Sequence, residues 1–114
     1  MKKVYNLLGL AHRAGKASSG TMAAKTSLLR RRAILLIMSE DIAPNSRESL
    51  ESTCIKQGIP WIHLGNKYDL GNAVGKAYRV AVTINDLGMA KAIKDVIEAS
   101  GEELKTMGVV EWPK

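Results

Sequence analysis

The spacing of hydrophobic residues along the chain changes between a helical and an extended period. From residue 4 to residue 14 they recur every three or four positions, which predicts a helix that Gly15 ends. A second helix is expected from about Thr21 to Arg30, with Thr21 or Gly20 as its cap. Three more helices are expected, from Pro44 to about Gly58, from Asn66 to about Gly75 and from Asp86 to Gly101.

Three short apolar runs are typical of buried strands. They are residues 33–38, 61–64 and 79–84, and the continuous first run is expected to be the central strand. Because strands alternate with helices, the sequence predicts an α/β fold with a predominantly parallel or mixed sheet between helix layers. We expect a single domain over residues 1–101 and a tail over residues 102–114, whose apolar positions show no clear period.

Positive charge is concentrated in the first third of the chain. Eight of the 17 Lys and Arg residues precede Glu40, which is the first of the 11 acidic residues, and the formal net charge is +6. Charge that is segregated in this way attracts a polyanion, and nucleic acid is the leading candidate. We expect the cationic groups to gather on one exposed patch, beside the loop that precedes the last strand.

Several classes of protein have little support in the sequence. The longest apolar run is too short to span a bilayer and the basic start lacks a signal-peptide pattern, so we expect no membrane partner and a cytoplasmic location. Cys54, the one cysteine, fits a buried core thiol better than a reactive or metal-binding thiol. Because His12 and His63 are the only histidines, no metal site is expected, and no cofactor either.

Catalytic residues are equally hard to find. Glu40 and Asp41 follow the predicted central strand, where ligands of α/β sheets often bind, but general acid–base chemistry would also need a partner and a pocket. A capping role for these two residues is favoured. Ser18 and Ser19 have no identifiable base. The sequence therefore predicts a protein that is not an enzyme.

The turn over residues 15–21 is the first candidate for phosphate binding. It has the glycine spacing of a nucleotide phosphate loop but lacks the lysine that must follow the second glycine, since Thr21 and Met22 occupy those places. Two interpretations stay open: an anion site at a helix start, assisted by Lys16 and Lys25, or a plain turn and cap.

The segment over residues 67–79 is the second candidate. Its Lys76 and Arg79 are suited to phosphate contact, and Tyr78 is suited to stacking on an unpaired base. The alternative for Tyr78, which we favour slightly from the sequence, is packing against the sheet. Trp61 is expected in the core.

Five segments together resemble a known protein family. They are residues 7–16, 19–20, 39–41, 44–45 and 70–75. In order and spacing they resemble the L-seven-Ae type of ribosomal protein, which binds kink-turn RNA, and especially its small bacterial YlxQ-like members. The resemblance covers nearly the whole domain and implies a three-layer α/β/α sandwich with a mixed four-stranded sheet.

The resemblance also implies an RNA-binding surface. Family members hold RNA with the start of the second helix and with the loop after the fourth helix. Carried onto this sequence, these surfaces are Gly20, Thr21, Met22, Ala23 and Lys25, and Lys76, Ala77, Tyr78 and Arg79. The basic stretch and its turn add Arg13, Lys16, Ser19 and Arg30 to the expected set.

One departure from the family pattern concerns specificity. Kink-turn binders carry Asn-Glu or Lys-Gln where this chain has Met22 and Ala23, and those polar side chains read the guanine edges of tandem G·A pairs. Neither Met nor Ala can supply this readout, so we expect RNA affinity dominated by phosphate contacts and weakened or altered kink-turn specificity.

Three hypotheses follow. The leading one is a noncatalytic, ribosomal-protein-like partner of structured RNA, either ribosomal or messenger. The second is a protein-interaction module, with ribosomal proteins as partners, for which an exposed Met22 would be suited. The third, a small enzyme acting on a phosphate ligand through residues 15–21 and Asp41, has the least support.

Overall fold

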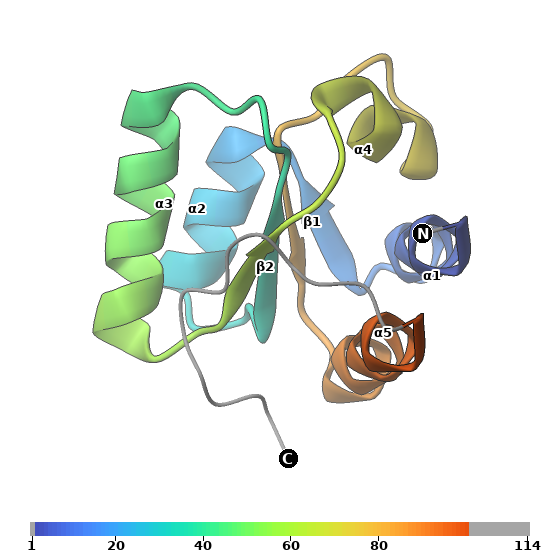
Figure 1. Cartoon of the computed structure of the whole chain (residues 1–114). Coiled ribbons are helices and arrows are strands. Elements are labelled where there is room, and N and C mark those ends of the chain that lie inside the picture. Colours follow the sequence, from blue (N-terminus) through green and yellow to red (C-terminus); the bar gives the residue numbers. More distant parts are fainter. Residues whose placement is uncertain (1, 101–114) are drawn as a thin grey trace.

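Helices and strands alternate along residues 2–100, the part of the chain that the computed structural model describes. The elements are α1 (Lys2–Arg13), β1 (Ala17–Ser19), α2 (Thr21–Leu29), β2 (Leu35–Met38), α3 (Pro44–Gln57), β3 (Trp61–His63), α4 (Lys67–Ala73), β4 (Ala81–Ile84) and α5 (Leu87–Ser100). Helices α2 and α3 cover one face of the sheet, and α1, α4 and α5 cover the other (Figure 1). The expected three-layer α/β/α sandwich is confirmed.

The four strands lie in the order β1-β4-β2-β3, so that β2 and β4 are the inner strands. Strand β4 is antiparallel to both of its neighbours, and β2 is parallel to β3. The sheet is therefore mixed, as expected, and a predominantly parallel sheet was the wrong alternative.

Strand β1 is the element that the apolar pattern did not predict. Its three residues are small or polar and only half-buried, and Ala17 pairs with Ile84 while Ser19 pairs with Val82. Because β1 is at the edge of the sheet, pairing with β4 rather than burial of an apolar face holds it extended.

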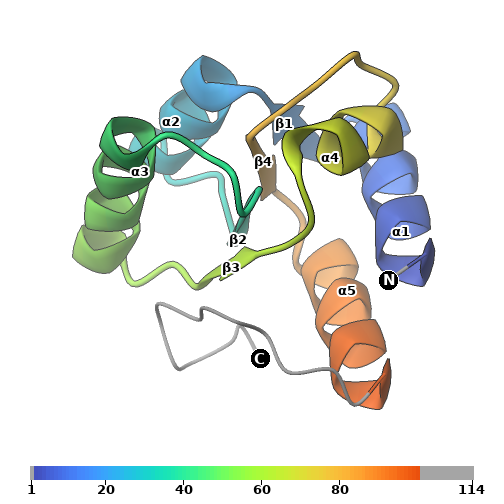
Figure 2. The same cartoon turned by 45° about the horizontal axis from the view of Figure 1, so that its top comes forward.

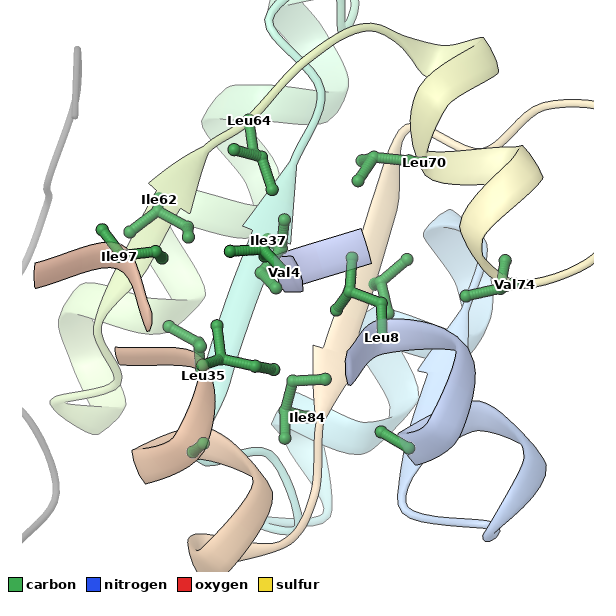
Figure 3. Close-up of a cluster of buried hydrophobic side chains, with 14 residues drawn as sticks. Val4, Leu8, Leu35, Ile37, Ile62, Leu64, Leu70, Val74, Ile84 and Ile97 are labelled. Carbon is green, nitrogen blue, oxygen red and sulfur yellow. The ribbon is translucent and has the colours of Figure 1, made fainter. Parts of the chain in front are cut away.

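Two apolar clusters lie on either side of the sheet. The cluster under α1, α4 and α5 includes Val4, Leu8, Leu35, Ile37 and Ile84, all fully buried (Figure 3). The cluster under α2 and α3 includes Leu28, Leu36, Met38, Leu50, Cys54 and Trp61. The sheet is thus covered by apolar contacts on both faces, which fits the continuous apolar run of β2.

Cys54 and Trp61 lie in the second cluster, as the sequence predicts. The thiol is buried, and burial, with a smaller effect of the Glu51 carboxylate, raises the pKa of Cys54 from 9.0 to about 12. At neutral pH the thiol is protonated, which makes it a poor nucleophile and a poor metal ligand.

Two negative findings apply to residues 2–100. None of the helices there combines the length and the apolar character needed to cross a membrane. Within the same residues, no group of His, Cys, Asp or Glu side chains is arranged to hold a metal ion. The expected tail, residues 102–114, lies outside the described residues.

Candidate nucleic-acid interface

The start of α2 and the loop between α4 and β4 meet around one hollow. This hollow, which we call the α2 hollow, has a volume of about 450 Å³ and is lined by Ser19, Gly20, Thr21, Met22, Ala23, Tyr78, Arg79 and Val80. In Figure 2 both segments lie on the upper side of the molecule. The fold thus brings together residues that are nearly 60 positions apart in the sequence.

The first turn of α2 has backbone N–H groups that its N-cap residue does not cap with a side chain. Gly20 is the N-cap, with φ 102° and ψ 153°, and no side chain caps the helix from this position. Gly20 still ties the turn to the sheet, because its N–H donates to the carbonyl oxygen of Ala81 at 2.9 Å. The first N–H groups of any α-helix lack intrahelical acceptors, so this end of α2 is suited to an anion. Thr21, the other candidate cap, is the first residue of the helix.

Arg79 lies directly over this helix start. A Cβ atom added to Gly20 would lie 3.7 Å from Nε and 3.8 Å from Cδ of Arg79. The backbone N–H of Arg79 donates to the carbonyl oxygen of Lys67 at 2.9 Å, and its Nη1 donates to the carbonyl oxygen of Tyr78 at 2.7 Å. Its Nε is buried and has no hydrogen-bond partner among residues 2–100. The guanidinium is thus held beside the N–H groups at the start of α2, with its Nε–H unpaired among the described residues.

Tyr78 and Met22 are the exposed apolar side chains of the hollow. Tyr78 is 57% exposed and Met22 is 85% exposed, so the alternative that Tyr78 packs against the sheet is wrong. The Lys67 ammonium lies 5.9 Å from the centroid of the Tyr78 ring and 5.3 Å from that of Tyr68. An accessible ring with a cation nearby is suited to stacking on an unpaired base.

Gly71 sets the position of the loop that carries Tyr78. A Cβ atom at Gly71 would lie 2.5 Å from the Tyr78 Cα and 2.7 Å from its N. These are backbone atoms, so α4 and the loop are in direct main-chain contact. The N–H of Lys76 also donates to the carbonyl oxygen of Gly71 at 2.8 Å. Lys76 and Ala77, which complete the expected loop surface, are exposed.

The remaining expected cations do not join this surface, and the prediction of one cationic patch is wrong. Lys16 precedes β1 and Gly20 follows it, so the two are separated by about 13 Å of extended chain. The Lys16 ammonium lies 3.8 Å from an Asp86 carboxylate oxygen. Arg30 is the C-cap of α2 and thus lies at the other end of that helix from Gly20. The cause is geometric, because β1 separates Lys16 from the start of α2 and α2 itself separates Arg30 from it.

Two further cations lie within other contacts. Lys25 is one turn into α2, but its ammonium donates to the side-chain oxygens of Ser49 and Thr53, at 2.8 Å each. It therefore joins α2 to α3. The anion site assisted by Lys16 and Lys25, one of the two open interpretations of this turn, stays a prediction. Arg13 lines a separate hollow of about 520 Å³ between α1 and α4.

The start of α4 has a different local chemistry. Asn66 Oδ1 accepts hydrogen bonds from the N–H groups of Tyr68 and Asp69, at 2.9 Å each, and the Asp69 carboxylate accepts from the Asn66 N–H. Asp41 Oδ1 accepts from the Lys67 N–H at 3.0 Å. Asn66 and Asp69 thus form a capping box at the expected start of this helix, and the favoured capping role of Asp41 is confirmed.

Sequence reasoning missed Lys67 and Tyr68 as neighbours of Tyr78. The signal was weak, because a Lys-Tyr pair at the start of a short helix is common and ten residues separate Tyr68 from Tyr78. Only the turn of the chain at residues 74–77 brings the two segments together. Val80, which also lines the α2 hollow, was expected only as a strand residue.

Comparison with known proteins identifies the family. The sequence pattern of the "Ribosomal protein L7Ae/L30e/S12e/Gadd45 family" matches residues 2–94. The chain belongs to this family. The "RNA-binding protein YlxQ" of Bacillus subtilis is 30% identical over 94 residues, which cover 82% of this chain and 94% of that protein. The "Large ribosomal subunit protein eL8" of Thermoplasma volcanium is 31% identical over 105 residues, which cover 91% and 87%.

Solved structures agree with this L7Ae family assignment. A protein of unknown function from Bacillus halodurans superposes with a TM-score of 0.79 at 30% identity, covering 84% of this chain and 97% of that one. The 15.5kD RNA-binding protein of Giardia lamblia superposes with a TM-score of 0.68 at 20% identity, covering 83% and 82%. The second likeness shows a shared fold.

Proposed function

We propose that this protein is a noncatalytic RNA-binding protein that holds a structured RNA in the α2 hollow, mainly through phosphate contacts. The observation that carries the proposal is the meeting of three features in one hollow of an L7Ae-family fold. These features are an uncapped helix start, the Arg79 guanidinium over Gly20, and the exposed ring of Tyr78.

The chemistry of the hollow favours a phosphate over a neutral ligand. Backbone N–H groups at a helix start and a guanidinium donate hydrogen bonds to phosphate oxygens, and the helix dipole adds a favourable field. Lys76, exposed on the same loop, adds positive charge without a fixed partner geometry. Such contacts hold the RNA backbone in register but carry little sequence information.

Sequence or shape readout would have to come from the other side chains of the hollow. Tyr78 offers a stacking face to a base that has left the helix. Met22 and Ala23 offer no hydrogen-bond donor or acceptor from their side chains, so tandem G·A pairs would not be read there. We therefore expect this protein to tolerate changes in those base pairs, provided that the RNA backbone keeps its shape.

The relatives support the choice of partner. One is named as an RNA-binding protein and another as a protein of the large ribosomal subunit. We infer that the partner of this chain is a structured ribosomal or messenger RNA and that the protein acts in the cytoplasm, where ribosomes assemble and translate. No reaction is needed to account for any feature of the α2 hollow.

Met22 favours a second candidate function, a protein-interaction module. It is 85% exposed beside the exposed Tyr78, and this apolar pair would suit a protein surface. Capture of a ribosomal protein by the purified chain after nuclease treatment, with no affinity for RNA, would favour this alternative.

RNA titration at several salt concentrations tests the proposal. The probes are a kink-turn RNA, the same RNA with its tandem G·A pairs replaced, and a plain duplex. We expect binding whose log–log salt slope is about −0.9 for each phosphate contact with duplex and about −0.7 with single strands. The two kink-turn probes should bind within a few-fold of one another. Binding that does not change with salt, or no binding to any probe at low salt, would contradict the proposal.

A further inference from the structure

Four helices of the described chain end with the same backbone motif. After each of α1, α2, α3 and α4, one backbone N–H donates to the carbonyl oxygen five residues earlier. The N–H of the residue just before it donates to the carbonyl oxygen three residues earlier. The residue that donates this second hydrogen bond has a left-handed backbone in every case: Gly15 at φ 73°, Arg31 at φ 57°, Gly58 at φ 69° and Gly75 at φ 74°. Three of these positions are glycine, and the one after α2 is arginine.

Arginine is a poor residue for this position. A left-handed backbone brings Cβ close to the following carbonyl oxygen, so glycine is strongly preferred at the end of such a helix. Arg31 is the one residue with a positive φ among residues 2–100 that is not glycine. A cation at a helix C-terminus interacts favourably with the dipole, but the adjacent Arg30 and Arg32 already supply that charge. The dipole therefore accounts for a basic helix end but not for the loss of glycine.

The side chains of Arg30, Arg31 and Arg32 are all exposed. The connection from Arg30 to Ile34 holds no acidic residue, and its Ile34 N–H bonds to the carbonyl oxygen of Ile84 at the end of β4. Helices α2 and α3 run in the same direction in Figure 1, so the two helices end at the same edge of the molecule. This edge is opposite the loop between α4 and β4.

We propose that Arg30, Arg31 and Arg32 form a second nucleic-acid contact, which holds the phosphate backbone of an RNA segment that the α2 hollow does not reach. The inference rests on the proposed RNA-binding function and adds a separate surface to it. Guanidinium groups bind phosphate with paired donors, and three consecutive arginines on an exposed turn can follow successive phosphates. The two surfaces are separated by the length of α2, about 13 Å along the helix axis, and face opposite edges of the sheet.

Arg31→Gly is the sharpest test because it separates folding from binding. Glycine suits the left-handed backbone, so thermal unfolding of the variant should occur at the same or a higher temperature than in the wild type. Affinity for an RNA duplex should fall about eightfold at about 0.1 M salt, and the log–log salt slope should shrink by about 0.9, if one phosphate contact is lost. Unchanged affinity and slope in Arg31→Gly would overturn the inference.

A charge-matched pair of variants removes the effect of net charge. Arg30→Gln with Arg32→Gln and Lys2→Gln with Lys3→Gln each delete two exposed cations. We expect the arginine pair to lower the slope for the duplex by about 1.8, twice the value for one contact, and the lysine pair to lower it much less. Equal losses would mean that overall charge, not this edge, drives binding, and would overturn the proposal.

A different result would refute the proposed RNA-binding function itself. If wild type binds neither the duplex nor polyuridine of the same length at low salt, then RNA binding itself is refuted, and this second contact with it. The second contact alone is refuted if the wild type binds RNA and Arg79→Ala weakens that binding, but the variants of Arg30, Arg31 and Arg32 do not weaken it.

Discussion

The starts of α2 and α4 lie on the same side of the molecule but differ in how they are capped. At α4, the side chains of Asn66, Asp69 and Asp41 provide the partners of the helix start from within the chain. At α2, Gly20 provides no side chain, and the guanidinium of Arg79, which is itself a donor, lies beside it. The start of α4 is capped by amide and carboxylate oxygens of the protein itself, and the start of α2 is left with donors only.

This difference is the reason that the start of α2, and not that of α4, is proposed as the anion site. The dipole and the free N–H groups are common to all helices. At α4 they stabilise the fold, whereas at α2 they stay available to a ligand. Sequence change at the two sites should therefore affect different properties: stability at α4 and RNA affinity at α2.

Removing Arg79 should have the largest effect on binding. Arg79→Ala takes away the guanidinium above Gly20, and loss of a charge-assisted contact to phosphate should weaken RNA affinity by about 1.5–3 kcal/mol. Electrophoretic mobility shift or fluorescence anisotropy at fixed salt would measure it. Lys91→Ala, an exposed cation on α5, is the matched control. An equal loss in the control would remove the distinction between the α2 hollow and general charge.

Adding one methyl group to Gly71 should affect both properties at once. In Gly71→Ala the new Cβ would collide with the Tyr78 backbone, and overpacking of this kind typically costs about 1–3 kcal/mol of unfolding free energy. Chemical denaturation would measure that cost. RNA affinity should fall as well, because Tyr78 and Arg79 move with the loop. Asn72→Ala, at an exposed position of the same helix, should leave both values nearly unchanged.

Removing the cap of α4 should lower stability more than binding. Asn66→Ala deletes the acceptor for two N–H groups, and loss of an N-cap side chain costs about 1 kcal/mol. The unfolding free energy from denaturant titration is the measurement. A variant that keeps its stability but loses RNA affinity would show that α4, and not α2, presents the ligand site.

The smallest effect is expected at Asp41. Asp41→Ala removes one exposed acceptor from the Lys67 N–H, so the loss of unfolding free energy should be about 0.3–1 kcal/mol and should decrease at high salt. Because Asp41 is an anion, its removal should leave RNA affinity equal or slightly higher. A clear drop in affinity would contradict the assignment of Asp41 to the fold alone.

Much of the architecture could be predicted because local residues mark it. Pro44 and Gly58 bound α3, the Asn66 capping box begins α4, and the apolar run of β2 is buried on both sides. Strand β1 was not predicted because its extended conformation comes from pairing with β4. A pattern of small and polar residues does not reveal such pairing.

The site was predictable only in part, because it also depends on contacts between residues far apart in the sequence. The turn before α2 and the segment with Tyr78 and Arg79 were candidates from the residues themselves, and the resemblance to the L7Ae family added Met22 and Ala23. The position of Arg79 over Gly20 depends on the pairing of β1 with β4, whose partners are more than 60 positions apart in the sequence. Charge counting gave the wrong distribution for Lys16, Lys25 and Arg30, because it ignores which end of a strand or helix each side chain occupies. The capped start of α4 is marked by Asn66 and Asp69 in the sequence, whereas the position of Arg79 at the uncapped start of α2 is not.

The main-chain contact between Gly71 and Tyr78 also bears on the thermodynamics of association. Since α4 fixes the adjoining loop directly, the receptor surface exists before any partner arrives, and little conformational entropy has to be lost when the complex forms. The heat-capacity change should then reflect only the area covered, without the large additional contribution that accompanies coupled folding.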